Sequence, residues 1–107
     1  MYNEEKAFKK MVKRRRDFHK FPETGWAEFR TTSKIAETLV RAGIDIAFAG
    51  DFIAKEHVMG RTADVQAHIK RSLKQGASHD FIDKMKGYTG LIAEIETGKP
   101  GPVTVLR

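Results

Sequence analysis

Apolar side chains recur at helical spacing near the N-terminus and predict a first helix from Asn3 to about His19. Asn3 is a favourable N-cap, and the acids Glu4 and Glu5 lie where the positive end of the helix dipole stabilises them. The face of this helix is made by Phe8, Met11, Val12, Arg15, Phe18 and His19. Pro22 should end the helix, because the residue before a proline is disfavoured in the α conformation.

A second helix is expected from about Trp26 to Ala42, with Gly43 placed to stop it. Its apolar stripe consists of Trp26, Phe29, Ile35, Ala36, Leu39 and Val40. Two such helices can pack on each other or on a sheet. The alternation of Ile44, Ile46 and Phe48 with more polar or smaller residues then predicts a short strand, which completes a first section over residues 1–49.

Residues 50–87 have weaker hydrophobic faces, and we interpret them as a helical insertion. A helix is expected over roughly Ala63 to Lys74, with Val65, Ile69 and Leu73 on one side. Ser78 should cap a short helix that carries Phe81, Ile82 and Met85.

Residues 88–107 carry the clearest strand pattern. The runs Leu91–Ile95 and Val103–Leu106 flank Gly98-Lys99-Pro100-Gly101, whose residues favour a turn, so we predict a β-hairpin. The second run reaches Arg107 with no turn or polar tail, which favours a truncated sheet with an open edge. The fold class is therefore expected to be α/β, with two leading helices, a helical insertion and a hairpin of a larger sheet.

Composition narrows the classes of protein. A chain of 107 residues suits one small domain, and 40% hydrophobic with 32% charged residues is typical of a globular protein rather than a disordered one. No run approaches the roughly 18–20 apolar residues of a membrane span. The first ten residues are polar, and there are no cysteines. These features predict a cytoplasmic protein with no membrane association.

The net charge of +6 arises mainly from one end of the sequence. Eight basic and three acidic side chains lie in residues 1–20, which leaves the remainder close to neutral. We interpret most of this charge as a solvated helix face, because cations are favoured near the C-terminal end of a helix. The alternative is a small nucleic-acid-binding module that uses the Lys6–Lys20 face and binds in a salt-dependent manner.

Residues that could perform chemistry are few. None of His19, His57, His68 and His79 is paired at the i, i+4 spacing of metal ligands on one helix face. His19 and Glu23 are four apart, but Pro22 breaks the helix that would align them. We expect His19 to be a partly buried, hydrogen-bonding residue at the helix end, and the other three histidines to lie at the surface.

The other candidate chemistries are weaker still. Ser33, Ser72 and Ser78 lack the context of a nucleophile elbow, and the Gly98–Gly101 turn lacks the spacing of a phosphate-binding loop. Phe18, Phe21, Trp26 and Phe29 gather around Pro22 and are expected to form core. The residues alone thus predict no catalytic and no metal-binding side chain, and leave substrate-binding residues unknown.

Two stretches carry a family resemblance. Arg15–Glu23, followed by Glu28-Phe29-Arg30-Thr31, resembles the opening motif of the aminoacylase/carboxypeptidase-type metallo-amidohydrolases. Tyr88–Ile95, continuing through Gly98-Lys99-Pro100-Gly101, is similar to the first hairpin of the same family. Glu23–Trp26 and the segment 50–87 are most similar to the members that cleave aminobenzoyl-glutamate. We refer to Arg15–Thr31 as the first motif and to Tyr88–Ile95 as the second motif.

The resemblance implies that the chain is the N-terminal part of a zinc-exopeptidase-like catalytic domain. The family hydrolyses the amide bond of an aminobenzoyl-glutamate or an N-acyl amino acid with two zinc or manganese ions and a carboxylate base. Those ligands and that base lie in segments beyond this chain, so it is expected to be inactive alone, with Arg15–Glu23 fixing the helix junction. A further alternative is a subunit-interaction module that forms a homo- or hetero-oligomer through the Val103–Leu106 edge.

Overall fold

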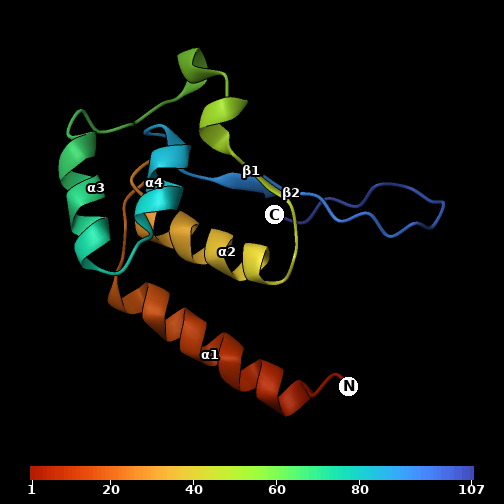
Figure 1. Cartoon of the computed structure of the whole chain (residues 1–107). Helices are drawn as coiled ribbons and strands as arrows, with labels where there is room; N and C mark the ends of the chain where they lie inside the picture. The colour runs from red at the N-terminus through yellow and green to blue at the C-terminus, as the bar shows by residue number, and fades with distance from the viewer.

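The computed structural model describes all residues, 1–107, as four α-helices, two short 3-10 helices and a two-stranded sheet (Figure 1). The α-helices are α1 (Glu4–Lys20), α2 (Phe29–Arg41), α3 (Val65–Lys74) and α4 (His79–Met85). The strands are β1 (Ile46–Phe48) and β2 (Leu91–Ala93), and the 3-10 helices are η1 (Ala49–Asp51) and η2 (Lys55–His57). None of the helices combines the length and the apolar character that crossing a membrane requires.

Helix α1 forms where the sequence predicts it but buries none of its side chains. The Asn3 side chain accepts a hydrogen bond from the Lys6 amide at 2.9 Å, as expected of an N-cap. Phe8 is 60% exposed and Met11 57% exposed, although both belong to the predicted apolar face. Figure 1 shows α1 apart from the other helices and joined to them at its C-terminal end. The predicted face therefore exists in the sequence but is not covered in this chain.

Helix α2 begins at Phe29, three residues later than predicted. Trp26 has a φ of 64°, in the left-handed region, and belongs to a turn in which the Ala27 amide donates to the Thr24 carbonyl. A residue in this conformation cannot continue a right-handed helix. The C-terminus is as predicted: Gly43 has a φ of 77°, its amide donates to Val40, and the following amide donates to Leu39. This arrangement is a Schellman motif, which satisfies the last helical carbonyls.

The predicted hairpin of residues 88–107 is wrong. β2 pairs with β1 in antiparallel register, with Phe48 opposite Leu91 and Ile46 opposite Ala93. Residues 103–106 form no strand, and Val103 and Leu106 are 92% and 91% exposed. The physical reason is that a strand needs a covered face as well as a paired edge. β1 and β2 receive that cover from α2 and α4, whereas the last run has no apolar layer to pack against.

The core lies between α2, the sheet and α4. Its buried residues are Phe29, Ala36, Phe48, Ala77, Ile82 and Met85, with Val65, Ile69 and Leu73 of α3 packed against them. The two helices expected within residues 50–87 are confirmed, and the Ser78 side chain caps α4 by accepting from the Phe81 amide. This segment is part of the core in spite of its weak hydrophobic faces. Its origin as an insertion stays a prediction.

Gly50 in η1 approaches α4 so closely that it has no room for a side chain. A Cβ there would collide with the carbonyl oxygen of Met85 and lie 3.3 Å from the Cβ of Lys86. We expect Gly50→Ala to lower the free energy of unfolding by about 1–3 kcal/mol, because overpacking forces the backbone to shift. Urea denaturation measures this change.

Gly25→Ala is the matched control, because a Cβ at Gly25 meets nothing within 4 Å. Its stability should be unchanged or slightly raised. Equal stability of the two variants would show that η1 and α4 are not in close contact.

Candidate functional site

The most connected polar cluster lies where α1 ends, α2 begins and α3 packs, and it is centred on Glu23. The Glu23 side chain is 1% exposed. Its Oε2 accepts from the Arg30 amide at 2.9 Å, and its Oε1 accepts from the amide and the hydroxyl of Thr31 at 2.7 and 2.8 Å. Glu23 therefore caps the first turn of α2, where free amides and the helix dipole favour a carboxylate.

A residue from α3 completes the shell around Glu23. Arg71 donates to Glu23 Oε2 at 2.7 Å and to the Ala27 carbonyl at 3.2 Å. Both oxygens of the buried carboxylate are thus satisfied, and its charge is paired. An unpaired buried carboxylate would be costly, so the pairing explains how Glu23 is retained in an enclosed position.

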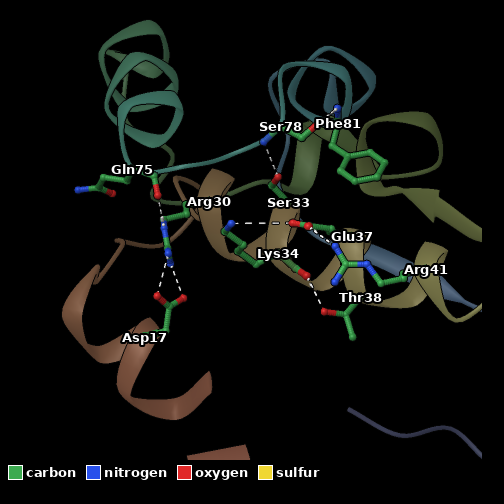
Figure 2. A network of polar contacts seen from close by, with 10 residues as sticks. All are labelled: Asp17, Arg30, Ser33, Lys34, Glu37, Thr38, Arg41, Gln75, Ser78 and Phe81. Atoms are coloured by element: carbon green, nitrogen blue, oxygen red, sulfur yellow. Dashed lines mark hydrogen bonds and ion pairs between the residues drawn. The ribbon is translucent and has the colours of Figure 1, made fainter. Parts of the chain in front are cut away.

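Arg30 extends the cluster toward α1, as Figure 2 shows. Its guanidinium makes two hydrogen bonds to the Asp17 carboxylate, at 2.9 and 3.0 Å, and its Nε donates to the Gln75 carbonyl at 2.8 Å. The same group stacks on the Phe21 ring, 4.2 Å from the centroid. Because the planar guanidinium forks onto one carboxylate, Arg30 fixes the direction in which α1 leaves the body of the molecule.

The charge of Asp17 is stabilised by this arrangement. The hydrogen bonds from Arg30 hold the pKa of Asp17 below its usual value of 3.8, against an opposing effect of burial. The charges of Arg30, Lys34 and Lys20 lower the pKa further. Asp17 is consequently ionised wherever the chain is folded at neutral pH.

The first and second motifs meet at the start of α2. The Thr89 hydroxyl donates to Glu28 Oε2 at 2.6 Å, and the Gly90 amide donates to the Thr32 hydroxyl at 3.1 Å. One residue further along α2, the Ser33 hydroxyl accepts from the Ser78 amide at 2.8 Å (Figure 2). The two stretches that carry the family resemblance are therefore neighbours in space, although about sixty residues separate them.

The histidines are not gathered into a site. His19 is exposed and its side chain makes no hydrogen bond, so the expectation of a partly buried, hydrogen-bonding residue was wrong. Asp17, two residues earlier on α1, makes the contact with α2 through Arg30. His57 and His79 are exposed, as expected, but His68 is half-buried with its Nδ1 2.7 Å from Arg71 Nη1.

The residues present do not fit the metal pair that the resemblance implies. No group of three or more His, Cys, Asp or Glu side chains is arranged to hold a metal ion. Glu23, the only carboxylate considered as a partner for His19, already accepts four hydrogen bonds. We therefore assign no metal-dependent step to the side chains of this chain.

The serines and aromatic residues have structural roles. Ser33 accepts from the Ser78 amide, and Ser72 donates to the Ile69 carbonyl at 2.7 Å. Among the aromatic residues around Pro22, Phe29 is fully buried, whereas Trp26 is only half-buried and Phe21 stacks under Arg30. The expected aromatic core is thus confirmed for Phe29 alone.

Sequence reasoning missed the two arginines that hold the cluster together. Arg30 lies within the first motif, so its presence there was a usable signal. Arg71 carried no signal, because it is 48 residues from Glu23 and its helix has no motif around it. Arg61 is a third case: its guanidinium covers the Tyr88 ring at 4.2 Å and donates to the Gly87 carbonyl at 2.7 Å.

Comparison with known proteins confirms the resemblance seen in the two motifs. No protein-family model matches the chain. It is 41% identical over 99 residues to a homolog of a p-aminobenzoyl-glutamate hydrolase subunit in Haemophilus influenzae, and 38% identical over 96 residues to the corresponding p-aminobenzoyl-glutamate hydrolase subunit of Escherichia coli. It is 36% identical over 100 residues to indole-3-acetyl-aspartic acid hydrolase of Enterobacter agglomerans.

A solved structure shows the same fold. The aminobenzoyl-glutamate utilization protein of Klebsiella pneumoniae superposes with a TM-score of 0.85 at 35% identity, over 92% of this chain and 26% of that one. The three curated relatives match 87–91% of this chain, but only 22–23% of their own lengths are covered. The chain thus spans about a quarter of each of these proteins, and its helices and sheet are consistent with part of a larger domain.

The Asp17–Arg30 pair makes stability depend on pH in a defined direction. Because the folded-state pKa of Asp17 lies below the unfolded value, its contribution is present above about pH 4 and is lost as pH falls through the folded-state pKa. We expect Asp17→Asn to lower the free energy of unfolding by roughly 1–2 kcal/mol at pH 7, a value discounted for the partial exposure of Asp17. The difference from the unmodified chain should shrink as the pH is lowered from 7 to below about 4.

Urea denaturation of both proteins across this range measures the effect. A difference that is the same at both ends of the range would show that the carboxylate charge of Asp17 has no part in the Arg30 contact.

Proposed function

We propose that this chain is part of a metal-dependent amidohydrolase that cleaves the amide bond of an aminobenzoyl-glutamate or a related N-acyl amino acid. The observation that carries the proposal is the direct contact between the two motifs, a hydrogen bond from Thr89 to Glu28. It is supported by the bond from the Gly90 amide to Thr32, the residue that follows the first motif. This contact occurs in a chain that superposes closely on an aminobenzoyl-glutamate utilization protein. The motifs are therefore combined in one fold rather than occurring separately.

The names of the relatives support a narrower class of substrate. p-Aminobenzoyl-glutamate and indole-3-acetyl-aspartic acid are both amides in which the amino group of an acidic amino acid is acylated. The shared part is the glutamate or aspartate, whereas the acyl groups differ. We infer that the substrate is an amide of an acidic amino acid, and that the acyl group is less restricted.

Within such an enzyme, this chain would supply structure rather than reacting groups. A metal pair in this family would activate a water molecule and polarise the amide carbonyl. The side chains of this chain do not fit that metal pair, so the ligands and the general base would come from the rest of the protein. Glu23, Arg30 and Arg71 would fix the positions of α1, α2 and α3 relative to one another. The chain alone would then be inactive.

Assembly and location are further parts of the proposal. Two of the relatives are named as one subunit of a hydrolase, which supports assembly with another subunit. The Val103–Leu106 run forms no strand here, so the sheet edge expected from it does not support that assembly. The basic charge of α1 is the only feature that favours the nucleic-acid alternative. A cytoplasmic location stays a prediction.

A chimera tests the proposal directly. The matched segment of the Escherichia coli p-aminobenzoyl-glutamate hydrolase is replaced by this chain, and hydrolysis of p-aminobenzoyl-glutamate is measured beside the parent enzyme with added zinc or manganese. We expect the kcat/KM of the chimera to lie within about tenfold of the parent value. A correctly folded replacement segment should leave the reacting groups of the rest of the enzyme in place. The 107-residue chain alone should show no turnover.

Two results would overturn the proposal. One is a chimera that has the circular dichroism and monodisperse size of the parent but no activity above the uncatalysed rate. The other is metal-dependent turnover by the isolated chain itself, which would contradict the structural role assigned to it.

A further inference from the structure

We propose that the exposed apolar face of α1 is an internal interface, covered by the remaining part of a hydrolase like the solved relative. The inference rests on the proposed function and specifies which surface of this chain the remainder contacts. The face consists of Phe8, Met11 and Val12, with Lys9, Lys13 and Arg16 along its border.

Helix α1 is amphipathic, yet its apolar face has no partner. Most of the stability of helices in proteins comes from packing an apolar face rather than from helix propensity. α1 has an N-cap at Asn3 and an exposed ion pair between Glu5 and Lys9 at 2.8 Å, each contributing a modest amount. No side chain of α1 is buried. The apolar face therefore lacks the contact that normally maintains such a helix.

The solved relative supplies enough further chain to make that contact. Its match covers 92% of this chain, and the unmatched part is shorter than the 17 residues of α1. At a TM-score of 0.85, the placement of at least part of α1 against the rest of the chain is shared. This chain corresponds to 26% of that protein, so about three quarters of the relative lies outside the matched region. That remainder is long enough to cover the face.

The chemistry of the face indicates what the covering surface carries. Phe8, Lys9, Val12, Lys13 and Arg16 line a shallow hollow of about 350 Å³ on α1. An apolar side chain fits its centre, and carboxylates are expected opposite its basic border. A second copy of this chain would bring the same basic border against itself, and like charges repel. Self-association through α1 is therefore disfavoured.

Thiol labelling measures whether the face is covered, and the absence of cysteine from the chain makes the measurement clean. Met11→Cys places a thiol on the face, and Met59→Cys places one at a site that is 83% exposed and lies outside it. Each variant is prepared both as the isolated chain and within the Escherichia coli chimera. Maleimide labelling of the introduced cysteine is followed by peptide mass spectrometry.

We expect the thiol at position 11 to react at least about tenfold more slowly in the chimera than in the isolated chain, because burial excludes the reagent. The thiol at position 59 should react at similar rates in both. Equal rates at position 11 in the two proteins would overturn the inference. The same two variants in a chimera with the Klebsiella protein provide a second test, and failure of both chimeras to fold would also count against it.

The outcome is separable from that of the proposed function. A chimera that hydrolyses substrate while position 11 stays fully reactive keeps the function and rejects the interface. A folded chimera with a protected position 11 and no activity keeps the interface and rejects the function.

An amphipathic basic helix can also lie on an anionic membrane. Protection of position 11 in the isolated chain by phosphatidylserine vesicles, without protection in the chimera, would replace the interface by a membrane surface.

Discussion

The buried carboxylate of Glu23 is the constraint on which the arrangement of the helices depends. A charged group removed from water must be paired and hydrogen-bonded, and Glu23 meets this requirement with the first amides of α2 and with Arg71 of α3. The chain must therefore turn sharply after α1, and the left-handed Trp26 lies in that turn. One side chain thus sets the start of α2, the turn before it and the position of α3.

From the N-terminal half of α2, polar contacts reach the other three α-helices and the residue before β2. Arg30 reaches α1 and the end of α3, Ser33 reaches the start of α4, and Thr32 reaches the residue before β2. The apolar core is small by comparison, since only 14 of the 107 residues are buried. The fold of this chain consequently depends on hydrogen-bonded side chains as well as on the apolar core. This balance is consistent with part of a larger domain.

Local signals in the sequence were sufficient for elements that are stabilised locally. The Asn3 cap, the Gly43 stop and the Ser78 cap each act within a few residues, and each is confirmed. The start of α2 was misplaced, because nothing local distinguishes a tryptophan in a left-handed turn from one in a helix. The hairpin was wrong because strand pairing is decided by which face is covered, and β1 lies more than forty residues before β2. The motif resemblance agrees with the relatives to which the chain is similar. No sequence pattern indicated the role of Arg71, because its partner Glu23 is 48 residues away.

The most direct test of the central role of Glu23 is the stability of Glu23→Gln, measured by urea denaturation at neutral pH against the unmodified chain. The amide keeps the size of the side chain but replaces one acceptor oxygen with a donor and leaves Arg71 without its charge partner. We predict a loss of about 2–4 kcal/mol in the free energy of unfolding. Glu37→Gln, which removes an exposed pair with Arg41, should change it by less than about 0.5 kcal/mol. Equal effects of the two substitutions would contradict the central role of Glu23.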